Sequence, residues 1–316
     1  MHRLLFLFLL TACSDYEFIT DKPSSEGETG SPVFDSGEPE TSTHADTWDL
    51  REVAGIDVLF FGDTSGSMAV ELTTLGEQVT AFVDRLVTYT SSWQLLAVTG
   101  PDGCGVGGVL TPDTPEYAAR FAEGITTPPG EDNVDEWGLY NSLQAVEKVG
   151  AKDCNAGFLR DEARLHVIFI SDEDDNSPGW DKGNPDYWRT YTDAIVAAKG
   201  DADQVVFSGV IGPAPDGCKG AEPGTGYAEA IAEYGGELLP ICDAWYKQID
   251  LLVDASVAWP IFRLSQTPVE DTLAAYVNGT ERDTGWTYVP TSNTVVFTEN
   301  IPTIGDEVAI AYELAE

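Results

Sequence analysis

The distribution of apolar residues after about residue 50 predicts alternating strands and helices. Continuous apolar runs at 58–61, 93–99 and 165–171 are typical of strands buried in a parallel sheet. Between the first two runs, apolar residues recur at helical spacing from Leu72 to Leu86. Alternating strands and helices form a mainly parallel sheet with helices on both faces. The sequence therefore predicts an α/β, doubly wound domain over residues 50–264.

After Ser265 the pattern changes to short runs rich in β-branched and aromatic residues. Turn signals such as Asn278-Gly279 separate them. The predicted strands are 273–277, 286–289, 294–298 and 307–312. We expect residues 265–316 to form a small all-β module that packs against the first domain, because about fifty residues bury little surface on their own.

The N-terminal region is predicted to be a targeting segment followed by a tether. Residues 1–12 combine a charged start with the apolar run Leu4–Leu10, which is too short to span a bilayer. The following Cys13 completes Leu-Thr-Ala-Cys, which resembles a bacterial lipoprotein lipobox and implies a lipid on the Cys13 thiol. The alternative is an ordinary signal peptide with an incidental cysteine. Residues 13–49 are rich in Ser, Thr, Gly, Pro and acids, which predicts a disordered acidic tether.

Charge limits the classes of partner. The formal net charge of the 316 residues is −38. Nucleic-acid binding needs a basic footprint, so we expect no nucleic-acid partner. An acidic, solvated surface and a lipid anchor place the protein in the cell envelope, on the extracytoplasmic side of a bacterial membrane, at the outer membrane or the periplasmic face.

Four cysteines remain after Cys13: Cys104, Cys154, Cys218 and Cys242. In an exported chain they predict two disulfides, with three possible connectivities. We expect Cys104–Cys154 and Cys218–Cys242, in loops at the ligand end of the sheet. A zinc site is the alternative, but the chain has no Cys-x-x-Cys pair.

The segment 56–68, IDVLFFGDTSGSM, carries the main candidate chemistry. Its apolar strand ends in Asp63, Ser65 and Ser67, whose alternation lets a turned backbone aim three oxygens at one point. Gly66 is expected to supply backbone freedom for that turn. A carboxylate and two hydroxyls are hard donors of the kind that Mg²⁺ and Ca²⁺ take. Ligands of open α/β sheets bind beyond the carboxyl ends of strands, where this cluster falls. The alternative is a Gly/Ser turn capped by Asp63.

This Asp-x-Ser-x-Ser pattern, after a strand and before an amphipathic helix, resembles the von Willebrand factor type A family. The resemblance implies a metal-ion-dependent adhesion site, in which Asp172, after the strand at 165–171, completes the ligand set. The family commonly has Gly where this chain has Glu173. The acids Glu173, Asp174 and Asp175 suggest either a second cation site or a solvated loop.

The family's remaining ligand is a threonine before the third helix, where this chain departs from the pattern. Thr126 and Thr127 lie in the expected loop but early in it. The expected position is nearer Asp132 or Asn133. All four stay open, with Thr127 and Asn133 taken as tentative ligands.

The resemblance implies binding rather than catalysis. A divalent cation, Mg²⁺ first with Ca²⁺ or Mn²⁺ as alternatives, would accept a carboxylate from a partner protein. The alternatives are a structural envelope lipoprotein, in which metal and disulfides only stabilise the fold, and a metal-assisted hydrolase. We expect no enzyme, because the histidines, His2, His44 and His166, lie in the leader, the linker and a predicted strand and give poor support to a Ser-His-Asp triad.

Overall fold

The computed structural model describes residues 43–50, 55–128, 136–179 and 184–315. The expected signal peptide and Cys13 lie outside these residues, as does the tether up to residue 42. No helix in the described part of the chain is long and apolar enough to cross a membrane.

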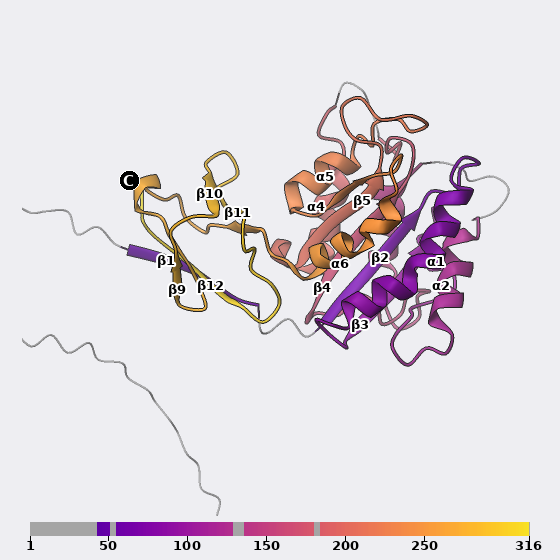
Figure 1. Ribbon diagram of the computed structural model, residues 1–316, viewed down its shortest axis with the longest axis horizontal. Helices are drawn as coiled ribbons and strands as arrows, with labels where there is room; N and C mark the ends of the chain where they lie inside the picture. The colour runs from indigo at the N-terminus through magenta and orange to yellow at the C-terminus, as the bar shows by residue number, and fades with distance from the viewer. Residues whose placement is uncertain (1–42, 51–54, 129–135, 180–183, 316) are drawn as a thin grey trace, which may run out of the picture. The chain divides into compact units, whose positions relative to one another are not determined.

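A five-stranded parallel sheet organises the first domain, in the order β3-β2-β4-β5-β6 (Figure 1). Its strands are β2 (Gly55–Gly62), β3 (Trp93–Val98), β4 (Ala163–Ile170), β5 (Val205–Ile211) and β6 (Leu238–Pro240). Strands β2, β4 and β5 are buried along their whole length, as their continuous apolar runs predicted.

Helices cover both faces of this sheet. They are α1 (Ala69–Leu86), α2 (Tyr117–Thr126), α3 (Gly138–Glu147), α4 (Arg189–Lys199), α5 (Tyr227–Tyr234) and α6 (Ile249–Val257), with short 3₁₀ turns η1 (Ala202–Gln204) and η2 (Trp245–Gln248). Alternate β2 residues point to opposite faces. Phe60 packs in one core with α1, α2 and α6, and Phe61 packs in the other with α3, α4 and α5. The predicted doubly wound α/β architecture is confirmed.

A separate region of antiparallel strands follows. Its strands are β7 (Ile261–Arg263), β8 (Ala274–Val277), β9 (Thr280–Arg282), β10 (Trp286–Val289), β11 (Thr294–Phe297) and β12 (Glu307–Glu313), with the 3₁₀ turn η3 (Glu270–Thr272). They form the sheets β1-β12-β8-β9 and β10-β11-β7 around their own apolar core. This is the expected β module, and it belongs to the same compact unit as the first domain.

Two boundaries of this β module differ from the prediction. Residues 43–49 were assigned to the tether, but β1 (Thr43–Asp49) pairs with β12 along its whole length. The segment has few apolar residues, so its local pattern does not reveal a strand, and β12 supplies the pairing edge. Likewise β7 pairs with β11 inside the module, although the first domain was expected to extend to residue 264.

Candidate metal centre

Two neighbouring parallel strands bring the predicted metal ligands together. Gly62 is opposite Ile170 in the register of β2 and β4, so the residues that follow both strands leave the sheet at one edge. The Asp63 amide also donates to the Ile170 carbonyl at 3.0 Å. Asp63 and Asp172 thus come from strands that are remote in sequence but adjacent in space.

A chain of hydrogen bonds links four predicted site residues. The Ser65 amide donates to Asp63 Oδ1 at 2.7 Å, which closes the turn. Ser65 Oγ lies 3.1 Å from Ser67 Oγ, and Ser67 Oγ donates to Asp172 Oδ1 at 3.2 Å. The structure therefore assembles two carboxylates and two hydroxyls at the carboxyl edge of the sheet.

Asp63 is held from a second side by Ser171, a residue to which the sequence assigned no role. Ser171 is buried, and its hydroxyl donates to Asp63 Oδ2 at 2.8 Å. Burial raises the pKa of the Asp63 carboxyl, and the bonds from Ser65 and Ser171 oppose that shift only in part. Ser171 lies directly before Asp172 at the end of a buried strand, and this position is the feature of the sequence that could have indicated its role.

Further acids surround the cluster. Burial, followed by the charge of Glu136, raises the pKa of Glu173 to about 7, and Asp63 and Asp172 act in the same direction. Burial and the charge of Asp172 also raise the pKa of Glu71. Excess negative charge at this edge favours a cation.

Of the four candidates for the remaining ligand, the structure describes Thr126 and Thr127, and both direct their hydroxyls to helix α2. The Thr127 hydroxyl donates to the Glu123 carbonyl at 2.6 Å, and the Thr126 hydroxyl donates to the Ala122 carbonyl at 2.6 Å. Both threonines therefore bond to the last turn of α2. Asn133, like Asp132, lies outside the described residues.

Glu173, Asp174 and Asp175 were expected to form a second cation site or a solvated loop, and for Asp175 the solvated loop is wrong. Asp175 is fully buried, and its Oδ1 accepts the Leu139 amide at 3.0 Å and the Ser177 hydroxyl at 2.9 Å. It therefore satisfies a free amide at the start of α3 from a distant loop. Burial raises the pKa of Asp175 to about 7 despite these bonds.

Gly66 also differs from expectation. It does not adopt a positive φ, and a Cβ at this position would meet nothing within 4 Å. The turn therefore does not need glycine for backbone freedom here. Gly62 is the constrained position, because a Cβ there would lie 2.8 Å from Ile125 Cδ1 and 3.0 Å from Leu72 Cδ2.

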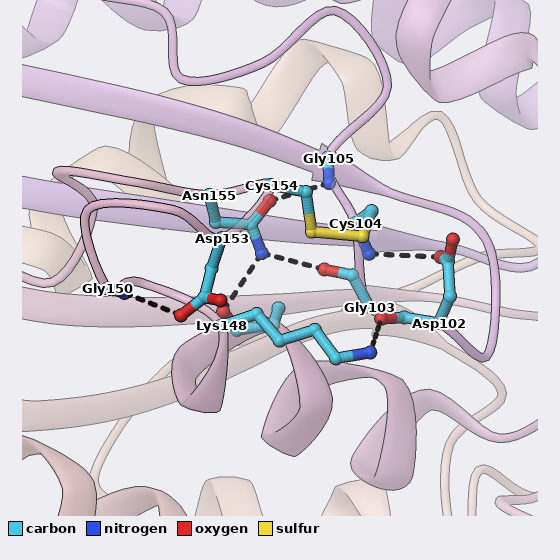
Figure 2. Close-up of a disulfide and its surroundings, with 10 residues drawn as sticks. Asp102, Gly103, Cys104, Gly105, Lys148, Gly150, Asp153, Cys154 and Asn155 are labelled. Atoms are coloured by element: carbon cyan, nitrogen blue, oxygen red, sulfur yellow. Dashed lines mark hydrogen bonds between the residues drawn. A yellow bond between two sulfur atoms is a disulfide. The ribbon is translucent and has the colours of Figure 1, made fainter.

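Both expected disulfides form, Cys104–Cys154 and Cys218–Cys242. Figure 2 shows the first one, beside Asn155, which donates to the Gly103 carbonyl at 2.8 Å and the Ala145 carbonyl at 2.9 Å. This bridge lies at the C-terminal end of α3 rather than at the predicted metal edge.

The second bridge does border the candidate site. Cys218 and Cys242 follow β5 and β6, at the carboxyl edge of the sheet. In the loop after Cys218, the Glu222 amide donates to the Asp172 carbonyl at 2.8 Å. The loop that this bridge closes therefore holds the backbone of a predicted ligand.

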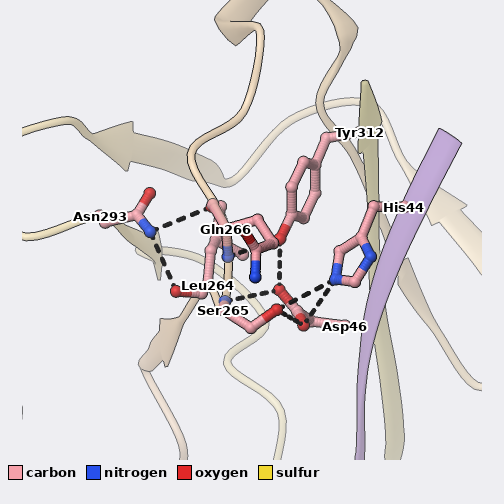
Figure 3. Close-up of polar contacts among 7 residues, drawn as sticks. All are labelled: His44, Asp46, Leu264, Ser265, Gln266, Asn293 and Tyr312. Carbon is pink, nitrogen blue, oxygen red and sulfur yellow. Dashed lines mark hydrogen bonds and ion pairs between the residues drawn. The ribbon is translucent and has the colours of Figure 1, made fainter. Parts of the chain in front are cut away.

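A Ser-His-Asp group lies elsewhere, in the β module (Figure 3). His44 Nε2 lies 3.0 Å from Ser265 Oγ and 3.2 Å from Asp46 Oδ1, while the Tyr312 hydroxyl donates to Asp46 Oδ2 at 2.6 Å. A catalytic triad places the carboxylate on the ring nitrogen opposite the serine. Here Ser265 and Asp46 both contact His44 Nε2, so the arrangement is not that of a catalytic triad. The hydrogen bonds instead hold β1 to the loop after β7.

The donor set at the sheet edge is thus two carboxylates and two serine hydroxyls. Among the described residues, no group of three or more His, Cys, Asp or Glu side chains is arranged to hold a metal ion. Any cation at this edge would therefore depend on the serine oxygens, which are uncharged ligands.

Comparison with known proteins gives similarities of structure only. No family model matches the sequence, and no curated protein matches it. Solved structures with a similar arrangement include a von Willebrand factor type A protein from Catenulispora acidiphila, with 14% identity and a TM-score of 0.43 over 89% of this chain. A second is proximal thread matrix protein 1 from the mussel byssus, with 15% identity and a TM-score of 0.38 over 67% of this chain.

A third is the pilus adhesin SpaC from Lactobacillus rhamnosus GG in an open conformation, with 12% identity and a TM-score of 0.38 over 86% of this chain. The chain covers 67%, 48% and 41% of the three structures, in the order given. The comparisons therefore show a structural likeness to three known proteins at low sequence identity.

Proposed function

We propose that this chain is a von Willebrand factor type A protein of the bacterial cell envelope, tethered through a lipid on Cys13, that binds a partner protein through a divalent cation. The observation that carries the proposal is the hydrogen-bonded contact between Ser67, of the Asp63–Ser67 loop, and Asp172. Two segments 105 residues apart meet there with oxygen donors only, as a hard cation requires.

The donors lie close enough together to share one cation. Ser65 Oγ and Ser67 Oγ are 3.1 Å apart, and Ser67 Oγ and Asp172 Oδ1 are 3.2 Å apart. Oxygen donors at this spacing suit both Mg²⁺ and Ca²⁺. We propose Mg²⁺ as the first candidate, with Asp63, Ser65, Ser67 and Asp172 as the residues that hold it.

Each residue has a distinct part in this proposal. Asp63 is fixed by Ser171 and the Ser65 amide, so it orients the loop. The exposed Ser67 side chain faces solvent, where a partner approaches. A bound cation would offer an open position to a carboxylate of the partner. Its charge would also lower the pKa of Glu173, so we propose binding and not base catalysis at this edge.

A calorimetric titration tests the metal site. Mg²⁺, Ca²⁺ and Mn²⁺ are added to chelator-treated protein, to Asp63→Ala, and to Glu77→Ala, which removes an exposed acid of α1 outside the site. The proposal expects one site in wild type and Glu77→Ala and none in Asp63→Ala. Equal binding by all three proteins, or no binding by the wild type, would contradict it.

One observation favours the alternative that this segment is a Gly/Ser turn capped by Asp63. Both carboxylate oxygens of Asp63 already accept hydrogen bonds, from Ser65 and Ser171, without any cation. In that case metal would change neither stability nor partner binding. The melting temperature with and without Mg²⁺ separates a capped turn from a metal site, since a ligand that binds only the folded state raises it.

A further inference from the structure

A cavity of about 300 Å³ opens directly beside the proposed metal ligands. One wall is the ligand loop, through Ser65 and Gly66. The facing wall is the end of α2 and the residues after it, through Thr126 and Pro128. Because Ser65 belongs both to the cavity and to the ligand cluster, an occupant would lie next to whatever binds the cation.

The lining of this cavity is uncharged. Its described residues include neither acids nor bases, although the chain carries a formal charge of −38. The hydroxyls of Thr73 and Thr126 donate to the Ala69 and Ala122 carbonyls at 2.7 and 2.6 Å. These two hydrogens are therefore committed to helix backbone, and Thr64 and Ser65 are the other hydroxyl residues of the lining.

We infer that this cavity is the specificity subsite for the partner: it takes an uncharged side chain that neighbours the metal-binding carboxylate. The inference rests on the proposed function, since the carboxylate defines which partner residue enters. Burial of an apolar side chain supplies the preference, because the described residues that line the cavity include no acid and no base.

The structure offers a way to close this cavity without straining the loop. Gly66 has open space around its Cβ position and no positive φ, so Gly66→Leu adds bulk at the wall. Thr126→Phe blocks it from the opposite side. Val70→Leu is the matched control, because Val70 is 70% exposed on the first turn of α1 and does not line the cavity.

The test uses three capped tripeptides, Val-Asp-Val, Gly-Asp-Gly and Lys-Asp-Lys, with the full protein in excess Mg²⁺ at physiological salt. Affinities come from ligand-detected NMR, and Mg²⁺ affinity is measured separately for each variant. We expect the valine peptide to bind about fivefold or more tightly than the glycine peptide of equal charge. At saturating Mg²⁺, Gly66→Leu and Thr126→Phe should abolish that ratio, and Val70→Leu should preserve it.

The lysine peptide gains a general attraction to the acidic chain that does not depend on the cavity, so at fixed salt its ratio to the glycine peptide should be the same in blocked and unblocked proteins. Mg²⁺-dependent binding of all peptides with no valine preference, or a preference that survives both blocking variants, overturns the subsite and leaves the proposed function standing. Absence of Mg²⁺ binding by the wild type overturns the proposed function, and the subsite with it.

Discussion

At the scale of single residues, the site depends on groups that satisfy one another before any ligand arrives. Ser171 and the Ser65 amide hold Asp63, and Asp175 holds the start of α3. Both aspartates are buried, but Asp63 fixes the ligand loop at the edge of the sheet, whereas Asp175 fixes the start of α3. Acids that look alike in the sequence therefore differ in what they do.

Asp175 predicts a pH dependence of stability. Its pKa is about 7 in the folded protein against 3.8 for the free group, so between these values the folded state binds more protons than the unfolded state. Stability contributed by this group is therefore present in acid and falls as pH rises from about 4 to 7, by at most about 4 kcal/mol. Urea unfolding across that range should show the fall in wild type.

Asp175→Asn removes the titration and keeps an acceptor for the Leu139 amide. The difference in unfolding free energy, wild type minus variant, should shrink steadily with rising pH. Asp102→Asn, an exposed control, should follow the wild type. A constant difference between wild type and Asp175→Asn would show that Asp175 keeps its ordinary pKa in the folded protein.

Two glycines of the ligand loop make a matched pair. Gly62→Ala forces contacts with Ile125 and Leu72, so we expect a loss of about 1–3 kcal/mol in unfolding free energy. A Cβ at Gly66 meets no atom within 4 Å, so Gly66→Ala should change the unfolding free energy by less than about 0.5 kcal/mol. Chemical denaturation of both variants measures this, and equal losses would refute the packing argument.

At the scale of elements, the carboxyl ends of β2 and β4 create the site, and loops fix its backbone. The loop that Cys218–Cys242 closes bonds to the Asp172 carbonyl, whereas Cys104–Cys154 lies at the far end of α3. The Cys218–Cys242 bridge therefore supports the candidate site, whereas the Cys104–Cys154 bridge supports only the fold.

Removing each disulfide should separate these roles. Replacement of either pair by serines should cost about 3–4 kcal/mol of stability, since the bridges close segments of 50 and 24 residues. Only the Cys218→Ser/Cys242→Ser protein should also lose Mg²⁺ affinity, measured by calorimetry on fully folded samples. Equal affinity in both double variants would mean that the loop at Glu222 does not position Asp172.

The sequence predicted the elements whose local apolar pattern is strong. It missed a strand that forms only because it pairs with a strand far away in the sequence. The runs at β2 and β4 are fully buried, so they are apolar and easily recognised. Strand β1 is half exposed and short of apolar residues, so only its partner β12 makes it a strand. Asp63, Ser65 and Ser67 were predicted from their spacing and Asp172 from the family resemblance. The role of Asp175 depends on long-range contacts that no local pattern reports.

At the scale of the whole molecule, strand β1 joins the two ends of the described chain. Trp48 packs against Phe262 with ring centroids 5.0 Å apart, and its indole N–H donates to Asp203 Oδ2 at 2.7 Å. Asp203 precedes β5, so a single side chain of β1 contacts both the β module and the α/β domain. The N-terminal strand is thus a structural part of the unit.

Loss of that contact should weaken the whole unit. Trp48→Ala should lower the unfolding free energy by about 2 kcal/mol, because a half-buried tryptophan loses both packing and a hydrogen bond. Its exposed neighbour is the control: Thr47→Ala should change it by less than about 0.5 kcal/mol. Differential scanning calorimetry also reports whether domain and module still melt together. A Trp48→Ala protein with an unchanged unfolding free energy would show that the contacts of Trp48 contribute little to stability.

The order of β1 and β2 along the chain has a mechanical consequence. Force applied to the chain before Thr43 and resisted at Asp63 travels along β1, through residues 50–54, and up the whole length of β2. Both strands would be stretched end to end, so the load follows covalent bonds and does not unzip the pairing of β2 with β3 and β4. Strand β1 also belongs to the sheet β1-β12-β8-β9, so its pairing with β12 resists the same pull by shear. A pull on the chain before Thr43 would therefore load the β module at the β1–β12 pairing before it reaches β2.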